Sequence, residues 1–201
     1  IADLFTRQKT GVGNYIFNLI SELHKICTDI SLIHYDRVPG YNTKRYPNIL
    51  KGKILETYSW YLSLPFYINK NPGGRIIHNP SQTPTFFTIN SPYIITVHDI
   101  TALKMPGMHR WGRILFTRMC LGRTLKHADK IIAVSHSTRK DLLDSFPFLS
   151  PHDIAVVHEA AGARYTIIEN SARRESCRKR YGLPEKFILF IGTLEPRKNI
   201  E

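Results

Sequence analysis

The chain has 201 residues, of which 42% are hydrophobic and 22% are charged, a composition typical of a globular protein that excludes a mainly disordered one. Its 28 lysines and arginines outnumber its 16 aspartates and glutamates, so the formal net charge is +12, which predicts an anionic partner: a nucleic acid, an acidic membrane surface or a phosphorylated small molecule. The longest apolar run, residues 60–68, is far shorter than the roughly 20 residues of a membrane-spanning helix, which excludes a transmembrane protein.

The three cysteines, Cys27, Cys120 and Cys177, are odd in number and have no CxxC spacing. They predict neither a disulfide framework nor a zinc site, and they favour a reducing, cytoplasmic compartment. The sequence begins at Ile1 without methionine and stops at Glu201 just after a strand-like run. We therefore expect the chain to be a fragment.

Apolar residues at helical spacing predict a first helix over residues 13–27, and the run 30–35 that follows predicts a strand. Further strand-sized apolar runs lie at 75–78, 93–97, 130–134, 154–157 and 186–191. Helical patterns separate several of these runs, at 110–127, 136–146 and 171–181. Short strands that alternate with helices predict an α/β fold, with a Rossmann-like parallel sheet covered by helices on both faces.

The domain organisation is expected to have three parts. Residues 1–170 form an N-terminal Rossmann-like domain, and residues 171–185 form a helix and linker. The glycine and proline at 182 and 184 are typical of the end of such a helix. Residues 186–201 then supply the first strand of a second α/β domain and the turn that follows it.

The first candidate site is Gly11-Val12-Gly13, at the start of the first helix. Glycines at this place let backbone N–H groups approach a phosphate, and the helix N-terminus adds partial positive charge. The alternative is a tight turn between a strand and the helix. A dinucleotide fingerprint would need a third glycine where Ile16 stands, which argues against NAD.

The second candidate is the pair His98 and Asp99, which follows the predicted strand 93–97. Ligands of open parallel sheets bind outside the carboxyl ends of the strands, so this pair is expected to face a crevice. There His98 would bind a sugar hydroxyl or transfer a proton. The alternative is that the two residues cap the next segment and stabilise a loop.

The third candidate is a basic stretch over residues 104–130, which holds seven lysines and arginines and a single acid, Asp129. It contains no recognised nucleic-acid motif, and a charge run is most often a solvated face. Together with the aromatic segment 58–67 it also has the composition of a surface that binds anionic membranes. The alternative for these aromatic residues is the protein core.

The fourth candidate is Arg197-Lys198, in the turn after the predicted strand 186–191. Two adjacent cations at the carboxyl end of a strand suit a diphosphate. Adjacent basic residues are also common on surface turns, so this pair by itself does not define a site.

Five segments occur in one order along nearly the whole chain: TGVGNYIFNLISEL, TVHDITALKMP, ADKIIAVSHSTRKDL, IAVVHEAAGARY and FILFIGTLEPRKNI. Together they resemble the retaining glycosyltransferases of the GT-B fold, in the glycosyl transferases group 1 family that includes mannosyltransferases. The resemblance implies two Rossmann-like domains that face a cleft. Residues 1–170 would be the acceptor-side domain and residues 186–201 the opening of the donor-side domain, so the fragment alone is expected to be inactive.

The resemblance also implies roles for single residues. Gly11, Val12 and Gly13 would approach the donor diphosphate and the transferred sugar, and His98, the candidate catalytic residue, would orient that sugar. Arg197 and Lys198 would hold the diphosphate of the leaving nucleotide.

Other positions have less direct roles. Asn14 and Asp99 are candidates on the acceptor side, whereas Ser135 is expected to cap the helix that follows it. Thr193 stands where many relatives have arginine, which removes one expected phosphate contact.

The resemblance implies transfer of a hexose, mannose or glucose, from a nucleotide sugar to a glycan or lipid-linked acceptor with retention of configuration. Neither a metal nor another cofactor is expected. The protein would act in the cytoplasm, with peripheral contact at the inner face of an anionic membrane. The alternatives are a GT-B sugar-nucleotide epimerase, which also uses a nucleotide sugar, and a nonenzymatic α/β domain that binds nucleic acid, which the charge alone supports.

Overall fold

The computed structural model describes residues 11–34, 43–45, 53–70, 73–108, 111–162, 165–192 and 198–200. The chain divides into two compact units, Ile1–Glu159 and Ala160–Glu201, and each is described by itself.

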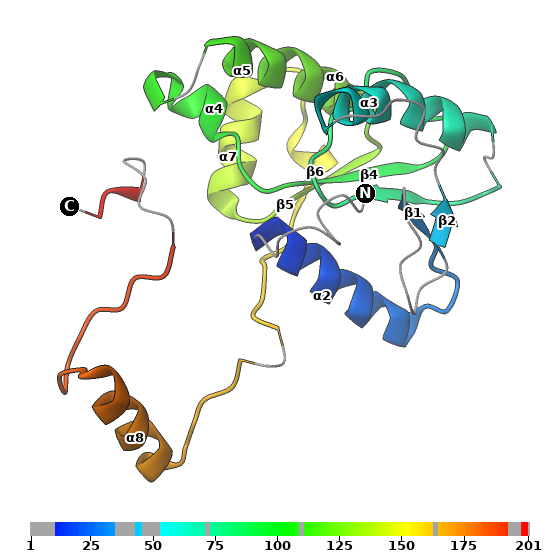
Figure 1. Ribbon diagram of the computed structural model, residues 1–201. Helices are drawn as coiled ribbons and strands as arrows, with labels where there is room; N and C mark the ends of the chain where they lie inside the picture. The colour runs from blue at the N-terminus through cyan, green and yellow to red at the C-terminus, as the bar shows by residue number, and fades with distance from the viewer. Residues whose placement is uncertain are drawn as a thin grey trace. The chain divides into compact units, whose positions relative to one another are not determined.

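The centre of the first unit is a parallel sheet of four strands in the order β3-β4-β5-β6 (Figure 1). The strands are β3 (Ile77–Asn79), β4 (Tyr93–Val97), β5 (Lys130–Ala133) and β6 (Ile154–Val156). Their positions confirm four of the predicted strands and the predicted parallel α/β fold. Two further strands, β1 (Leu32–His34) and β2 (Thr43–Arg45), form a separate parallel pair.

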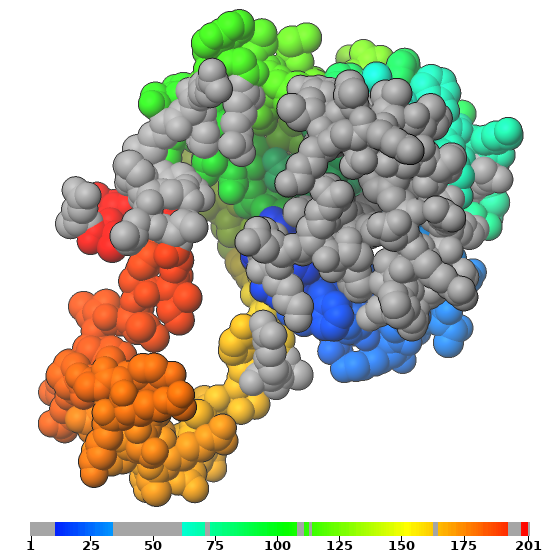
Figure 2. Space-filling model, viewed as in Figure 1, coloured from blue at the N-terminus to red at the C-terminus, as the bar shows by residue number. Residues whose placement is uncertain are grey.

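Helices cover both faces of the four-stranded sheet, as predicted (Figure 1). On one face lies α2 (Gly11–Ile26), whose outer side forms the blue surface in Figure 2. On the other face lie α3 (Lys53–Lys70), α4 (Thr101–Lys104), α5 (Trp111–Phe116), α6 (Gly122–Lys126) and α7 (His136–Ser145). The second unit contains α8 (Ser171–Tyr181), which ends at Gly182 in the left-handed conformation, with φ of 60°.

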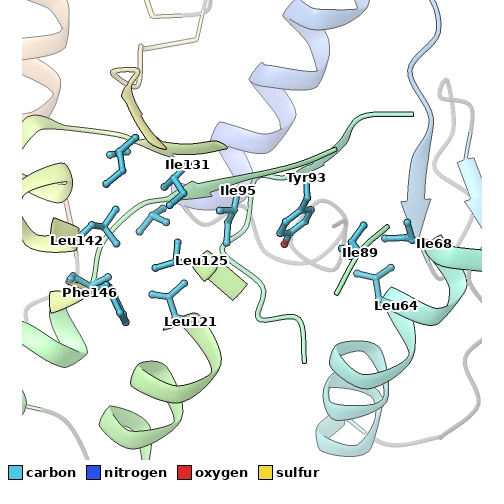
Figure 3. Close-up of a cluster of buried hydrophobic side chains, with 14 residues drawn as sticks. Leu64, Ile68, Ile89, Tyr93, Ile95, Leu121, Leu125, Ile131, Leu142 and Phe146 are labelled. Atoms are coloured by element: carbon cyan, nitrogen blue, oxygen red, sulfur yellow. The ribbon is translucent and has the colours of Figure 1, made fainter. Parts of the chain in front are cut away.

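The main core lies between the sheet and the helices α3, α6 and α7 (Figure 3). Side chains alternate between the two faces of a strand, so Tyr93, Ile95 and Val97 of β4 all point into this core. There they pack with Leu125 of α6 and Leu142 of α7. The opposite face of β4 carries Thr96, which has no exposed surface and faces α2.

The helix predicted over residues 110–127 is present with one irregular turn. A π-helical turn, η2 (Thr117–Leu121), joins α5 to α6, and the backbone remains helical at Phe116 and Gly122 on either side of it. A Cβ atom on Gly122 would lie 3.1 Å from the ring of Phe146, so a glycine at this position lets the helix approach α7 closely.

Two local predictions are also confirmed by the described residues. The hydroxyl of Ser135 accepts a hydrogen bond of 3.0 Å from the backbone N–H of Thr138, so Ser135 caps α7. Helix α8 begins and ends where the pattern of residues 171–181 predicts it, with Asn170 as its N-cap.

Three elements differ from the prediction. Helix α3 is not among the predicted helices. It includes Pro65, and burial of Leu64 and Ile68 against the core outweighs the loss of one backbone hydrogen bond. Strand β2 lies in a stretch for which no strand is predicted. Residues 186–191 form no strand, and Ile188 is fully exposed. A strand needs a neighbouring strand for its backbone hydrogen bonds. The domain boundaries at 170 and 186 stay predictions.

The buried hydroxyl of Thr124 gives a test of this packing. It accepts a hydrogen bond of 2.9 Å from the backbone N–H of Thr85 and donates one of 2.8 Å to the carbonyl of Cys120. A Thr124→Val substitution keeps the shape of the side chain but leaves the Thr85 N–H buried without an acceptor. We expect the free energy of unfolding to fall by about 1–3 kcal/mol in urea titrations. The exposed control Thr88→Val should change it by less than about 0.5 kcal/mol, and equal losses in the two variants would refute this assignment.

Candidate functional site

The candidate site lies at the carboxyl edge of the four-stranded sheet. Strand β4 ends at Val97 and is followed by His98, whereas β6 ends at Val156 and is followed three residues later by Glu159. Because all four strands are parallel, their carboxyl ends meet at one edge, where ligands of such sheets bind.

His98 is held at this edge through its backbone and its ring. Its N–H donates to Oε1 of Gln82 at 3.0 Å, and its carbonyl accepts from the hydroxyl of Thr138 at 3.2 Å. The ring nitrogen Nε2 lies 2.9 Å from the carbonyl oxygen of Pro80, and Nδ1 lies 2.8 Å from Oε1 of Glu159. Contacts from three separate segments therefore fix the position and the orientation of this histidine.

Tyr15 connects the start of α2 to His98. The two rings meet edge to face, with their centroids 5.0 Å apart. The hydroxyl of Tyr15 lies 3.3 Å from Oγ1 of Thr96, and burial raises the pKa of Tyr15, so this hydroxyl keeps its proton. Tyr15 is one helical turn after Gly11, so the structure brings the Gly11-Val12-Gly13 segment and His98 to the same edge of the sheet.

The predicted glycine segment lies within the first turn of α2 rather than in a loop before it. Val12 packs against the small apolar cluster of Ile16, Ile20 and Leu32, whereas Gly11 is exposed, with no neighbour within 4 Å of the place where a Cβ atom would stand. The first turn of a helix directs N–H groups and the positive end of its dipole toward the start of the helix, which suits an anion. The acceptor-side candidate Asn14 lies half-buried in the same turn.

Asp99 has a structural contact, in line with the capping alternative. Its Oδ1 accepts hydrogen bonds from the backbone N–H and the hydroxyl of Thr101, at 3.1 Å and 2.9 Å. The carboxylate thereby stabilises the start of α4. A role of Asp99 on the acceptor side remains a prediction.

Behind the site, His78 of β3 shares the hydroxyl of Thr96 with Tyr15. Its Nε2 lies 2.9 Å from Oγ1 of Thr96. Burial lowers the pKa of His78 to about 4, so its ring is neutral at physiological pH. Three polar side chains from α2, β3 and β4 thus meet in the layer beneath the site.

Several cations of the basic stretch 104–130 make contacts within the protein. Lys104 pairs with Asp141 and Asp144 of α7 at 3.1 Å and 3.5 Å, and the hydrogen bond to Asp141 is the main cause of its raised pKa. Arg123 donates to the carbonyl of Phe86, and Lys130 donates to the carbonyl of His152. These contacts account for part of the local charge without an anionic ligand.

The second predicted phosphate-binding pair is described only in part. Lys198 belongs to the second unit, where its Nζ lies 5.7 Å from the centroid of the Phe190 ring. Arg197 and Thr193 lie outside the described residues, as do the side chains of the aromatic segment from 58 to 61.

Two features are absent from the described residues. These residues hold no group of three or more histidine, cysteine, aspartate or glutamate side chains that could bind a metal ion. Among the same residues, no helix is both long and apolar enough to cross a bilayer.

The sequence points to His98 but not to its partners Glu159, Tyr15 and Gln82. In the sequence, Tyr15 belongs to an apolar helix face, and Glu159 belongs to one of the five resembling segments. A signal for Glu159 does exist, because it follows a predicted strand by two residues and so falls at the same sheet edge as His98.

Comparison with known proteins agrees with this architecture. The family model of Glycosyltransferase Family 4 matches residues 9–161, which include all four strands of the central sheet and His98. The chain belongs to this family. The predicted resemblance to GT-B glycosyltransferases of group 1 is thereby confirmed, as is the Rossmann-like α/β fold.

The similar curated proteins include mannosyltransferases. The chain is 31% identical over 218 residues to the O-antigen chain mannosyltransferase B of Escherichia coli, covering 95% of this chain and 54% of that protein. It is 34% identical over 129 residues to the serotype-specific mannosyltransferase WbdA of Escherichia coli, covering 62% of this chain and 16% of that protein. It is 22% identical over 205 residues to the alpha-maltose-1-phosphate synthase of Mycolicibacterium smegmatis, covering 94% and 51%. The chain thus spans about half the length of the first and third of these relatives and much less of the second.

The lowered pKa of His78 gives a test of the layer beneath the site. An unfolded histidine takes up a proton near pH 6.5, whereas folded His78 stays neutral down to about pH 4. Its contribution to stability is therefore complete above pH 6.5 and is lost as the pH falls from 6.5 to 4. The loss in the free energy of unfolding should reach at most about 3 kcal/mol.

Urea titrations at neutral and at acidic pH measure this loss. A His78→Gln variant, which cannot titrate in this range, should lose much less stability on acidification than the wild type. The exposed histidine His152 supplies the control, because His152→Gln should leave the pH dependence unchanged. A His78→Gln variant with the same pH dependence as the wild type would contradict the prediction.

Proposed function

We propose that this chain is the acceptor-side part of a glycosyltransferase that moves a hexose from a nucleotide-sugar donor to a glycan or lipid-linked acceptor, with retention of configuration. The observation that carries the proposal is the fixed position of His98 at the carboxyl end of β4, beside the first turn of α2, in a chain of Glycosyltransferase Family 4. This arrangement offers an oriented imidazole next to an anion-binding helix start.

The chemistry of transfer suits these groups. When a nucleotide sugar reacts, the bond from the anomeric carbon to the diphosphate breaks, so positive charge grows on the sugar and negative charge on the diphosphate. Preorganised donors near the growing negative charge lower the barrier. In our proposal the first turn of α2 binds the diphosphate, and His98 orients the sugar.

Mannose is the sugar that we favour. Two of the similar proteins bear mannosyltransferase in their names, and one of these names also contains O-antigen chain. We therefore propose mannosyl transfer in the synthesis of a surface polysaccharide or lipopolysaccharide, with glucose as the second choice. The reaction would take place in the cytoplasm and would need no metal ion, because cations and N–H groups of the protein stabilise the diphosphate.

An anionic membrane is the proposed surface on which the protein meets a lipid-linked acceptor. Trp111, Leu115 and Met119 stand four residues apart along α5 and η2, with 78%, 49% and 64% of their surfaces exposed. Arg118 and Lys126 are exposed on the same run of helix. Residues of α4 and α5 form the green surface at the top of Figure 2. Exposed apolar side chains among cations are typical of helices that lie in an anionic lipid interface.

The transfer reaction tests the proposed function directly. The complete protein is incubated with nucleotide-activated mannose or glucose and a glycan or lipid-linked acceptor, and the released nucleotide and the product are measured. A His98→Ala variant should reduce kcat/KM by about 100-fold, the usual cost of losing one preorganised hydrogen-bond donor. The control His152→Ala changes an exposed histidine outside the site and should retain full activity. Added EDTA should leave the rate unchanged.

Three results would contradict the proposal: no nucleotide released from any common sugar donor, full activity in His98→Ala, or release of an epimerised free sugar nucleotide in place of a transferred sugar. Loss of activity in EDTA would overturn the metal-free mechanism alone. The configuration of the product, read by NMR, decides between retention and inversion.

The proposed membrane surface predicts binding to vesicles. The protein should sediment with vesicles of phosphatidylcholine and phosphatidylglycerol, and much less with phosphatidylcholine alone. A double substitution of Trp111→Ser and Leu115→Ser should weaken binding by about tenfold or more, because two apolar side chains no longer enter the interface.

A matched control changes an exposed apolar residue elsewhere. Ile26→Ser lies at the end of α2, where Ile26 is also largely exposed, and should leave vesicle binding unchanged. Equal binding by the double variant and the wild type would refute the assignment of this surface.

A further inference from the structure

The ring of His98 faces one hydrogen-bond acceptor at each nitrogen. Nε2 lies 2.9 Å from the carbonyl oxygen of Pro80, and Nδ1 lies 2.8 Å from Oε1 of Glu159. A carbonyl oxygen and an ionised carboxylate accept hydrogen bonds but cannot donate them. Both contacts are hydrogen bonds at the same time only in the form of the ring that carries hydrogen on both nitrogens.

We propose that Glu159 is a positioning residue for His98: its carboxylate holds the ring in one orientation and in the doubly protonated form. This proposal rests on the proposed function, because Glu159 would act in sugar transfer through His98. A neutral ring could satisfy only one of the two acceptors, and the other nitrogen would then direct its lone pair at an oxygen. The carboxylate thus selects the form of the ring that donates from both sides.

The other polar groups near His98 are held by different partners. The hydroxyl of Tyr15 contacts Thr96, and neutral His78 contacts the same threonine from behind. The carboxylate of Asp99 is bonded to Thr101. The charge of Glu159 also contributes to the raised pKa of Tyr15, which agrees with its place beside both rings. Within the described residues, Glu159 is therefore the anion that faces the imidazole directly.

The two acceptors differ in their access to solvent. Pro80 is buried, and Asn79 beside it is held by hydrogen bonds to Tyr93 and to the carbonyl of Thr83. The side chain of Glu159 is 46% exposed and that of His98 is 14% exposed. The pair is therefore open to solvent on the side of Glu159 and closed on the side of Pro80. A doubly protonated ring has no lone pair, so His98 acts as a donor and not as a general base.

Nitrogen-15 NMR of the His98 ring in the ligand-free protein tests the pair without any sugar. At one fixed pH near neutrality, the fraction of His98 rings that carry hydrogen on both nitrogens should fall several-fold in Glu159→Gln, which keeps the size of the side chain but removes its charge. The control Glu22→Gln removes an exposed carboxylate that pairs with Lys25 and should leave the His98 ring unchanged. An unchanged ring in Glu159→Gln overturns the proposal.

Transfer kinetics then test the positioning role. Glu159→Gln should lower kcat by about tenfold, with the KM for the donor within about threefold. In a His98→Asn background, the same substitution should have no further effect, because Glu159 acts through His98. Equal losses in both backgrounds would overturn the proposal. A wild type that transfers no sugar would overturn the proposed function, whereas the NMR result would still decide whether Glu159 controls the ring.

Discussion

The buried hydroxyl of Thr96 is the contact on which the arrangement of the site depends. It lies within a strand, has no exposed surface, and meets Tyr15 from α2 on one side and His78 from β3 on the other. Burial of a hydroxyl without a hydrogen-bond partner in this layer would make folding less favourable. The contact between Tyr15 and Thr96 therefore stabilises α2 in this position. That placement brings the first turn of α2 beside His98. The helix start, the histidine and the sheet edge are thus aligned by one polar contact beneath them.

The strands and most helices could be predicted because their signals are local. The side chains of residues 93–97 alternate between the core and the face toward α2. The helix over residues 171–181 begins after a polar N-cap and ends at a glycine. Helix α3 could not be predicted in the same way, since Pro65 argues against a helix in isolation and only the burial of its neighbours favours one. The run 186–191 shows the converse, because an apolar strand pattern predicts a strand only where another strand can pair with it.

The candidate site could be predicted in type but not in its contacts. The segment around His98 and its place after a strand identified the residue, and the parallel topology fixed the edge at which it lies. Its partner Glu159 is 61 residues away, and no spacing rule specifies which of several polar residues at that edge meets the ring. The charge of +12 was similarly ambiguous. Part of the positive charge lies in ion pairs within the protein, such as that of Lys104 with Asp141. Composition alone cannot distinguish such pairs from a surface that binds a ligand.

The two acceptors that enclose His98 both follow strand ends closely, Pro80 directly after β3 and Glu159 three residues after β6. The lengths of these two connections are therefore as constrained as the residues themselves. One residue inserted between Val156 and Glu159 would move the carboxylate off the ring with every catalytic side chain still present. Insertions and deletions in either connection should thus be rejected even though they leave every side chain of the site in place.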